Sequence, residues 1–385
     1  MGATPLPADC RAAFEALRAF PFRGRVAGCI LATMRIRVTR ELGAALDAAL
    51  DMLLPVEPYL AYANFPPMAR REHAVFDLHR RRWQQAAAFG VLVARDEDDR
   101  ALAMLALGRR EFETAHFDMA MAKIEPPMGV PEESSRLPAL RVLYAAAVER
   151  LRADGYPHVS AVSSTHDRAA CWVLQECGAF YVGTKISWMQ ALTGRRQPHD
   201  LPAHLSIDVH EKAAIPKLNP AAWRRLYEWS GKAFDRGPYV FDLTVPHDRA
   251  MGIYQTWTQK AMSGEWADIL LLIRDGDEIV AFHTMMLLED LSDAAGVRIV
   301  GRGIGGTLPG YRGLFTALQK ECAAIRPLGA SFLENETQVS TIQSINVFGK
   351  LGHRCLRSTA SFHMRLDGGG TVQQRAGSGR VLAER

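Results

Sequence analysis

The chain has 385 residues, of which 48% are hydrophobic and 23% are charged, and its formal net charge is +4. This composition is typical of a globular protein with two or three domains, each large enough to bury a core. The weak net charge excludes the strongly basic composition of many nucleic-acid binders. The densest basic run, His79 to Trp83, is interpreted as a solvated helix face, so we expect no nucleic-acid partner.

Six cysteines are scattered along the chain without a CxxC pair or a cysteine–histidine cluster. Zinc sites need closely spaced thiolate and imidazole ligands, so we expect no metal and free thiols in a reducing compartment. The N-terminus shows no basic segment followed by an apolar one, and the longest nearby apolar run, Val26 to Met34, has nine residues. We therefore expect no signal peptide, no membrane contact and a cytoplasmic location.

Helices and strands are predicted to alternate in the first half of the chain. Apolar residues at helical spacing predict helices at 41–54, 137–153 and 167–178. β-favouring residues and alternation predict a strand, turn and strand at 89–108 and further strands at 117–127, 158–165 and 180–192. Residues 193–204 combine charges, prolines and a glycine without apolar period, which is typical of a linker.

The same order of elements returns after residue 204. The predicted elements are a helix at 254–266, a strand, turn and strand at 267–289, a strand at 297–308, a helix at 311–325, a strand at 331–339, a helix at 342–352 and a strand at 359–366. We therefore expect domains at 1–192 and 205–366. A glycine-rich polar tail at 367–385 is expected to be disordered.

Two landmarks make this repeat measurable. Arg95 in the first turn and Gly178 at the end of the late helix are 83 residues apart, and Arg274 and Gly352 are 78 residues apart. Near-equal spans with a matched element order favour two copies of one fold, with chance similarity of common α/β elements as the alternative.

The stretch "TLPGYRGLFTALQK", Thr307 to Lys320, leads from a proline turn through an Arg-Gly pair into a helix. The first N–H groups of a helix have no internal partner and lie at the positive end of the helix dipole, so they bind phosphate. Gly313 would let a phosphate approach, and Arg312 would add charge beside it. An ordinary turn before an ordinary helix is the alternative.

The element order and the Pro-x-x-Arg-Gly turn resemble the GNAT superfamily of acyl-CoA-dependent N-acyltransferases. Arg312 and Ala317 match its central motif, whereas Phe315 replaces the first motif glycine. The late pattern of the superfamily resembles Thr341, Ser344, Phe348 and Lys350-Leu351-Gly352. The resemblance implies an α/β (α+β) fold with tandem GNAT-like domains, each with a mixed, mostly antiparallel central sheet flanked by helices.

Within the superfamily, the second half resembles the acetyltransferases of TDP-linked amino sugars, of the TDP-fucosamine type. "FDRGPYVFD" (Phe234 to Asp242), Tyr254-x-x-Trp257 and "ETQ" (Glu336 to Gln338) carry this resemblance, and Phe112 to Ile124 resembles their opening segment. It implies transfer of an acetyl or other acyl group from coenzyme A to a primary amine, with an amino sugar among the candidates. A polyamine, an amino acid, a biosynthetic intermediate or a protein lysine stays open as the acceptor, and so do a monomer and a homodimer.

The resemblance also implies a binding site for acetyl-CoA, or another acyl-CoA, as co-substrate. The residues that it implies for this site are Gly306, Thr307, Leu308, Arg312, Gly313, Leu314, Phe315, Thr316, Thr341 and Phe348. The first copy has no Arg-Gly pair at this place, and Glu132 and Glu133 would repel a pyrophosphate. We expect the first copy to be a scaffold or one wall of the substrate cleft. A non-catalytic tandem module that binds an acyl-CoA or a partner is the alternative function.

Acyl transfer needs a base for the amine proton and a donor for the departing thiolate. Family members often use a tyrosine of the late helix as the donor, but this chain has Phe348 there. The candidate catalytic residues are Glu336, His283 and His363, each with the alternative of an ordinary packed or surface residue. Alternation along the strand predicts that Glu334 and Glu336 share one face, whereas Asn335 and Thr337 share the other.

Overall fold

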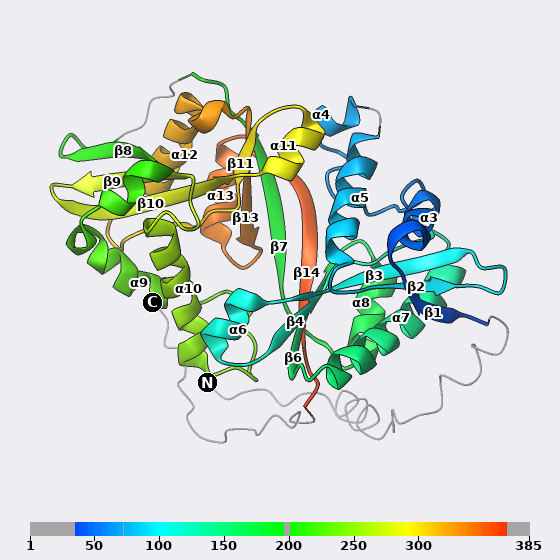
Figure 1. Cartoon of the computed structure of the whole chain (residues 1–385). Coiled ribbons are helices and arrows are strands. Elements are labelled where there is room, and N and C mark those ends of the chain that lie inside the picture. The colour runs from blue at the N-terminus through cyan, green and yellow to red at the C-terminus, as the bar shows by residue number, and fades with distance from the viewer. Residues whose placement is uncertain (1–34, 72, 196–200, 368–385) are drawn as a thin grey trace, which may run out of the picture.

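The structure is a computed structural model that describes residues 35–71, 73–195 and 201–367. The predicted tail lies outside this range, except for Asp367. Within these ranges no helix combines the length and the apolar character needed to cross a bilayer. Figure 1 shows two halves joined at the middle by long strands.

The first half follows the predicted alternation of helices and strands. Its elements are β1 (Arg37–Arg40), α3 (Gly43–Leu53), α4 (Pro66–Ala69), α5 (Ala74–Ala86), β2 (Val91–Arg95), β3 (Ala101–Arg109), α6 (Glu111–Phe117), β4 (Met121–Ile124), β5 (Met128–Gly129), α7 (Glu133–Ala153), β6 (His158–Ser164), α8 (Arg168–Glu176) and β7 (Phe180–Ala191). The strand predicted at 117–127 was too long. Asp118 adopts a left-handed φ of 52° and ends α6, so that only Met121–Ile124 extends as a strand.

The second half repeats this order. Its elements are β8 (Leu205–Glu211), η1 (Lys212–Lys217), η2 (Pro220–Trp223), α9 (Arg224–Ala233), α10 (His247–Met262), β9 (Ile269–Asp275), β10 (Glu278–Leu287), α11 (Glu289–Ala295), β11 (Ile299–Gly301), β12 (Gly305–Thr307), α12 (Leu314–Ile325), η3 (Pro327–Gly329), β13 (Phe332–Gln338), α13 (Ile342–Lys350) and β14 (Arg354–Arg365). The single strand predicted at 297–308 is wrong, because a bulge at Arg302 divides it into β11 and β12.

One mixed sheet runs through both halves in the order β1-β2-β3-β4-β6-β14-β7-β13-β11-β10-β9-β8. Among the described residues only β4–β6 and β11–β13 pair in parallel, so the sheet is mostly antiparallel, as predicted. β14 lies between β6 and β7 of the first half, and β7 lies between β13 and β14 of the second. The last strand of each half therefore completes the sheet of the other half.

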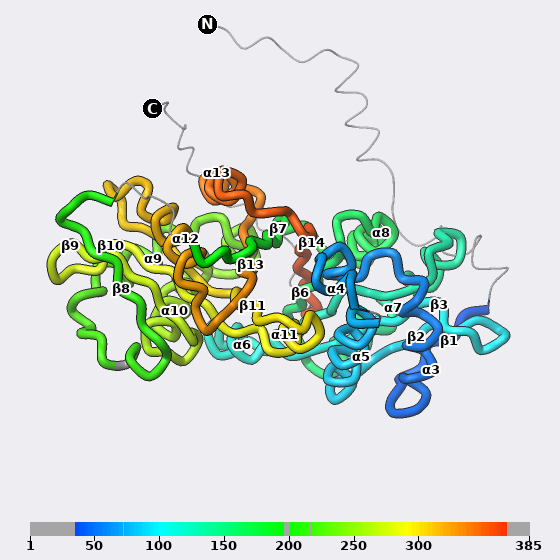
Figure 2. The backbone as a smooth tube through the Cα atoms, turned by 90° about the horizontal axis from the view of Figure 1, so that it is seen from above, coloured from blue at the N-terminus to red at the C-terminus, as the bar shows by residue number. Residues whose placement is uncertain are grey.

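Helices cover both faces of the sheet. Figure 2 shows α3, α5 and α11 on one side and α8 and α13 on the other. On the α5 side, two hydrophobic clusters join the halves. One packs Tyr62, Phe65 and Leu78 against Leu291 of α11, and the other packs Phe117 and Met121 against residues of α10 and the segment before it. Between these clusters the middle strands present polar side chains.

The run His79 to Trp83 lies in α5, and its interpretation as a solvated face was wrong in part. Trp83 is buried, and the guanidinium of Arg82 lies 5.5 Å from the centre of the Tyr62 ring. Helical spacing turns Arg82 toward the middle of the sheet rather than toward solvent, because α5 packs with this side against the loop that carries Tyr62.

The strand exchange predicts that neither half forms a folded monomer alone. Residues 35–200 would lack β14 between β6 and β7, and residues 201–367 would lack β7 between β13 and β14, which leaves unpaired strand edges that aggregate or pair with other chains. Separate expression should give insoluble or self-associated material by size-exclusion chromatography, whereas co-expression should give a complex of both halves. A cooperatively unfolding monomer of either half would contradict this expectation.

Candidate functional site

The two strands β11 and β12 are separated by a bulge at which the sheet opens. Gly301 is the last residue of β11 paired with β13, opposite Glu334, and in the described chain β12 pairs with β10 but not with β13. Arg302 adopts a φ of 55°, and a Cβ on Gly303 would overlap the carbonyl oxygen of Thr284. The hydroxyl of Thr284 accepts from the N–H of Ile304 at 2.8 Å, which fixes the bulge. The gap between β12 and β13 is called the second opening below.

The Pro-Gly turn leads from the second opening into α12. Gly310 and Gly313 have φ angles of 93° and 83°, and a Cβ on either would meet no atom within 4 Å. The hydroxyl of Tyr311 donates to Asp275 at 2.8 Å and ties the turn to β9. Gly313 is the N-cap of α12 without a side-chain cap, and Arg312 is exposed. The first N–H groups of α12 therefore face open space, where an anion can reach them.

Aromatic rings line the α12–α13 side of the second opening. Phe315 of α12 lies 5.7 Å from the ring of His283 and 6.1 Å from that of Phe348, which is 3% exposed. Phe348 in turn contacts Trp188 and stacks on His353. These rings exclude water from one side of the opening.

Three residues around the second opening carry buried polar atoms without a hydrogen-bond partner among the described residues. They are Oγ1 of Thr307, Nε1 of Trp188 and both ring nitrogens of His353. Buried polar groups are normally hydrogen-bonded, so unpaired donors and acceptors beside an opening are suited to a ligand with amide groups.

The corresponding place in the first copy is filled by an ion-paired cluster. β5 pairs with β3 but, in the part of the chain described, not with β6, so the same opening exists there. Arg136 in the first turn of α7 places Nη1 3.0 Å from Oε2 of Glu57 and Nη2 2.5 Å from Oδ2 of Asp167. Glu57 also accepts from the N–H of Gly129. All three charged side chains are buried, and Glu133 adds a negative charge at the helix start.

A second group of charged residues lies on the face of β13 that points away from α12, on the α5 side of the sheet. The hydroxyl of Tyr62 donates to Glu334, 3.0 Å from Oε1 and 3.1 Å from Oε2. Nη2 of Arg357 lies 3.6 Å from Glu334 and 3.3 Å from Glu336, while Ser187 donates to Glu336 at 3.0 Å. Glu334 and Glu336 therefore share one face, and Asn335 faces α12, as alternation predicts.

The two carboxylates of this group differ in proton affinity. Glu334 is 0% exposed, and burial raises its pKa although Arg357 opposes the shift. Burial would also raise the pKa of Glu336, but Lys185, Arg357 and the hydrogen bond from Ser187 lower it to about 2. Glu334 is thus the better proton acceptor, and Glu336 stays ionised.

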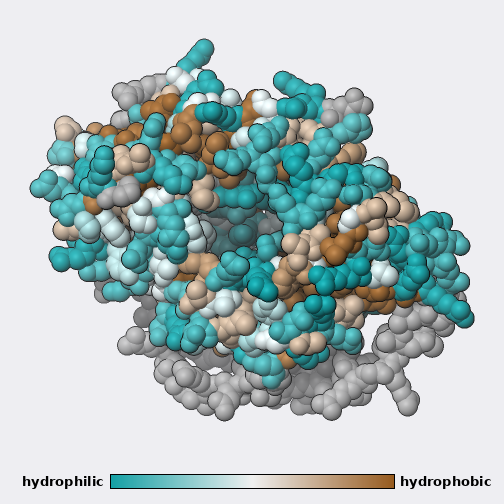
Figure 3. All heavy atoms as spheres, in the orientation of Figure 1, coloured by the Kyte–Doolittle hydropathy of each residue, from teal (hydrophilic) through white to brown (hydrophobic). Residues whose placement is uncertain are grey.

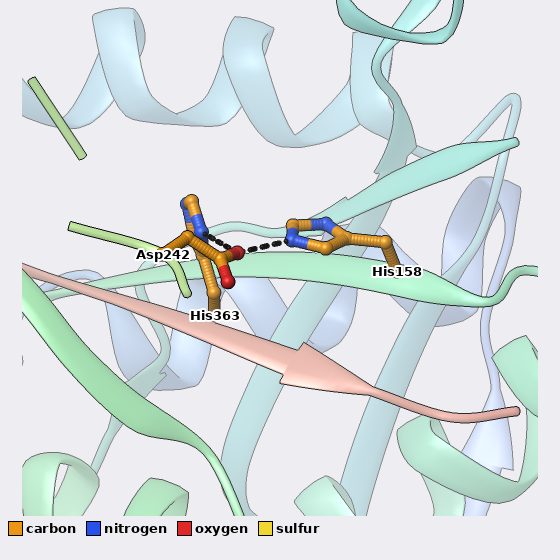
Figure 4. Close-up of side chains that lie close together, drawn as sticks. All are labelled: His158, Asp242 and His363. Carbon is orange, nitrogen blue, oxygen red and sulfur yellow. Dashed lines mark hydrogen bonds and ion pairs between the residues drawn. The ribbon is translucent and has the colours of Figure 1, made fainter. Parts of the chain in front are cut away.

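Three buried side chains, His158, Asp242 and His363, join the two halves and are called the clamp. Nε2 of His158 on β6 lies 2.8 Å and Nδ1 of His363 on β14 lies 2.7 Å from the same Oδ2 of Asp242 (Figure 4). Thr244 donates to the other carboxylate oxygen through its N–H and its hydroxyl. Burial would raise the pKa of Asp242, but these hydrogen bonds hold it well below its usual range, and burial lowers the pKa of His363 to about 4.

The clamp has three atoms that could ligate a metal ion. Its N···O distances are those of hydrogen bonds, however, and are shorter than the roughly 3.3 Å between ligands that lie about 2.0 Å from one tetrahedral zinc ion. Nδ1 of His158 also has no acceptor within the described structure, although a metal-bound histidine normally donates through its second nitrogen. The geometry is therefore that of a hydrogen-bonded clamp.

No protein-family profile matches the chain, and no curated protein gives a significant sequence match. The structure resembles a GCN5-related N-acetyltransferase from Sphaerobacter thermophilus, with a TM-score of 0.55 and 15% identity, over 86% of this chain and 96% of the other. It also resembles the GCN5-related glucosamine N-acetyltransferase region of a fungal multi-domain GH3 β-N-acetylglucosaminidase, with a TM-score of 0.51 and 14% identity. That match covers 87% of this chain and 38% of the fungal chain.

The chain has the GNAT fold. The turn before α12 and the late helix α13 are the elements that the sequence resemblance named, whereas the bulge between β11 and β12 was not predicted. At 14–15% identity, these likenesses establish the fold and leave the reaction to the site residues.

The GNAT fold gathers the predicted cofactor residues around the second opening. Gly306, Thr307 and Leu308 lie on β12 or at its end, Arg312 to Thr316 form the turn and the start of α12, Thr341 is the N-cap of α13, and Phe348 lies on α13. A Cβ on Gly306 would approach the ring of Trp229 to 2.6 Å, so glycine is needed there. Their binding role stays a prediction.

The three predicted catalytic residues lie in three different environments. Glu336 belongs to the charged group on the α5 side, and His363 belongs to the clamp. His283 is buried beside α12, 3.1 Å from Gln319, and burial lowers its pKa to about 4. No hydrogen bond, ion pair or ring contact joins any two of them in the described structure.

Sequence reasoning missed the residues that surround Glu334. Tyr62, Arg302 and Arg357 come from a loop of the first copy, the bulge and β14. None has a local motif, and Tyr62 is 272 residues away from Glu334. Only Arg302, beside the Gly-Ile-Gly-Gly run after a strand, carried a signal that could have indicated the bulge.

Buried neutral histidines predict a loss of stability in acid. Burial lowers the pKa of His353 to about 4, below the 6.5 of an unfolded histidine. The unfolded chain therefore binds a proton first, and the stability contributed by neutral His353 is full above pH 6.5 and lost as the pH falls toward 4. At pH 5 this loss amounts to about 2 kcal/mol.

Urea unfolding at pH 7.5 and pH 5 measures this loss. His353→Leu should reduce the difference between the two pH values by about 2 kcal/mol, whereas His166→Gln, at an exposed position, should leave it as in the parent. Equal pH dependence of His353→Leu and the parent would show that His353 does not titrate in this way.

Proposed function

We propose that the protein is an acyl-CoA-dependent N-acyltransferase that moves an acetyl or other acyl group to a primary amine. The observation that carries the proposal is the second opening: two strands of a GNAT fold part beside an uncapped helix start with open glycines. The likeness to two GCN5-related N-acetyltransferases supports it. The chain resembles the glucosamine N-acetyltransferase region of the fungal protein, and its second half resembles amino-sugar acetyltransferases in sequence. Both observations keep an amino sugar among the candidate acceptors.

The second opening would hold the cofactor along its length. The pyrophosphate would lie at the start of α12, where the N–H groups of the first turn and Arg312 supply positive charge. The pantetheine arm would pass along β12, since its amides match the unpaired hydroxyl of Thr307 and the open strand edge. Phe315 and Phe348 would pack against it and keep water from the thioester.

The acceptor amine would approach from the α5 side. Its nitrogen attacks the thioester carbonyl, the C–N bond forms, and the C–S bond breaks to leave the coenzyme A thiolate. The amine proton passes to Glu334, whose raised pKa makes it the stronger base, through the hydroxyl of Tyr62 that covers it. Glu336, which is held ionised and is 29% exposed, faces the incoming ammonium group.

A non-catalytic module is the second candidate. Phe348, which cannot donate a proton to the thiolate, favours this candidate. The ring of Trp188 contacts Phe348, and its unpaired Nε1–H could donate a hydrogen bond to a thiolate but could not protonate it. Release of free thiol from acetyl-CoA in the presence of a primary amine would exclude this candidate.

Cofactor binding is tested by isothermal titration with acetyl-CoA. We expect one site per chain, because Glu57, Arg136 and Asp167 fill the corresponding gap between β5 and β6 in the first copy. Arg312→Glu should weaken binding by at least about 10-fold, since a negative charge then faces the pyrophosphate. The matched control Glu133→Lys, at the corresponding turn of α7, should leave the affinity unchanged.

Two sites per chain, or equal affinity in Arg312→Glu and the parent, would contradict the assignment of the cofactor to the second opening. The same titration in the Glu133→Lys variant shows whether the effect of Arg312→Glu comes from charge at the start of α12. A change in affinity in Glu133→Lys would mean that the net charge of the protein is enough to alter binding.

The role of Glu334 is tested by steady-state thiol release. Glu334→Gln should lower kcat by roughly 10²-fold to 10⁴-fold, because the general base is lost, while the affinity for acetyl-CoA is retained. In the parent, kcat should fall as the pH drops through the raised pKa of Glu334, and the variant should lack this dependence. Glu336→Gln should mainly raise the KM of the amine. An unchanged acidic limb in Glu334→Gln would assign the base elsewhere.

A further inference from the structure

The middle of the α5 side is hollowed, and the hollow has a hydrophilic floor (Figure 3). It lies between the two hydrophobic clusters that join the halves. The charged group around Glu334 lies on this face of the middle strands, with partly exposed side chains: Arg302 is 44%, Lys185 35%, Glu336 29% and Arg357 26% exposed. A ligand can therefore reach these groups.

Positive charge exceeds negative charge in this group. Arg82, Arg302, Arg357 and Lys185 carry four positive charges, whereas Glu334 and Glu336 carry at most two negative ones. The raised pKa of Glu334 makes the surplus larger as the pH falls. Burial lowers the pKa of Arg82, and the nearby charges of Arg302 and Arg357 lower it further, so the three guanidinium groups are close enough to repel one another.

Two of these guanidinium groups have incomplete partners. Arg302 lies 3.9 Å from Glu334, beyond hydrogen-bond distance, and Arg82 contacts the face of Tyr62 without a carboxylate in the described structure. Tyr62 holds Arg357 on its ring as well, at 5.1 Å. The ring thus gathers Arg82 and Arg357 while its hydroxyl binds Glu334. Tyr62 is also a side-chain hydrogen-bond partner of Arg82 and Arg302. Each guanidinium group has five N–H donors, so donors remain for a carboxylate or phosphate, which arginine binds through two parallel hydrogen bonds.

We propose that the acceptor amine carries an oxyanion, a carboxylate or a phosphate group, and that Arg302 and Arg82 bind it on the floor of the hollow. This inference rests on the proposed function, since it places the anion beside the base of the transfer. The bulge that opens the sheet for the cofactor also turns Arg302 toward the hollow, because its left-handed backbone reverses the alternation of the strand. The anion would hold the acceptor, and its amine would face Glu334 and Glu336.

Binding to the protein saturated with coenzyme A tests the proposal without turnover. The bound coenzyme fills the pyrophosphate site, so that an anionic probe reports on the hollow. Two matched pairs separate the sources of the oxyanion: glucosamine 6-phosphate against glucosamine, and alanine against alaninamide. We expect at least one anionic member to bind 10-fold or more tightly than its neutral counterpart in isothermal titration.

Substitution of the arginines assigns the site. Arg302→Gln removes the charge while it keeps an unbranched, polar side chain, and it should abolish the difference within the favoured pair by weakening only the anionic member. Arg82→Gln should act in the same direction. Arg141→Gln removes the same charge from the far side of the first half, where Arg141 pairs with Glu176, and should leave both affinities unchanged.

The proposal is overturned if neither anionic probe binds more tightly than its neutral counterpart, or if Arg302→Gln weakens both members of the pair equally. Thiol release is measured separately with the same amines. Anion binding that depends on Arg302, without thiol release from any amine, would uphold the anion site and contradict the proposed acyl transfer. Thiol release without any preference for an anionic amine would uphold the proposed acyl transfer and contradict the anion site.

Discussion

β7 and β14 run side by side along the middle of the sheet, and each is paired on its other edge with the half to which it does not belong in sequence. This exchange places β13, which carries Glu334 and Glu336, directly beside β7 of the first half. It also brings the loop with Tyr62 and the helix with Arg82 over the same strands. The charged hollow is consequently built by both halves, and neither half contains it alone.

The two copies use the same opening in opposite ways. In the second copy, the gap between β12 and β13 is lined by aromatic rings, and the helix beside it begins with glycine and an exposed arginine. In the first copy, Arg136 enters the corresponding gap and is held by Glu57 and Asp167. Removing one partner from such a buried ion pair leaves an uncompensated charge and lowers the free energy of unfolding by about 3–5 kcal/mol. A single substitution of Arg136, Glu57 or Asp167 therefore destabilises the first copy instead of simply emptying its opening.

The sequence alone predicted the features that depend on local pattern. Periodicity and turn residues predicted most of the strands and helices in their repeated order, and the Pro-Gly turn before α12 was identified from its glycines and Arg312. The alternation rule placed Glu334 and Glu336 on one face. The same rules failed for 297–308, where an arginine in a left-handed conformation interrupts a strand without any change in apolar pattern.

The remaining features depend on contacts between distant residues. Nothing in the pattern of 359–366 indicates that this strand pairs with β6 rather than with its own half, because strand pairing is set by long-range packing. The hydrogen bond between Tyr62 and Glu334 spans 272 residues. Arg82 looked like part of a solvated basic run, since the ring that it contacts comes from another segment.

The clamp of His158, Asp242 and His363 has a consequence for how such a chain can change over time. It binds a strand of the first copy to a strand and a loop of the second, at a point where all three side chains are buried. A first copy whose opening is filled by ion pairs cannot then be discarded, because its loss would unpair one edge each of β13 and β14 and leave Asp242 without His158. The second half can therefore be inherited only together with the first.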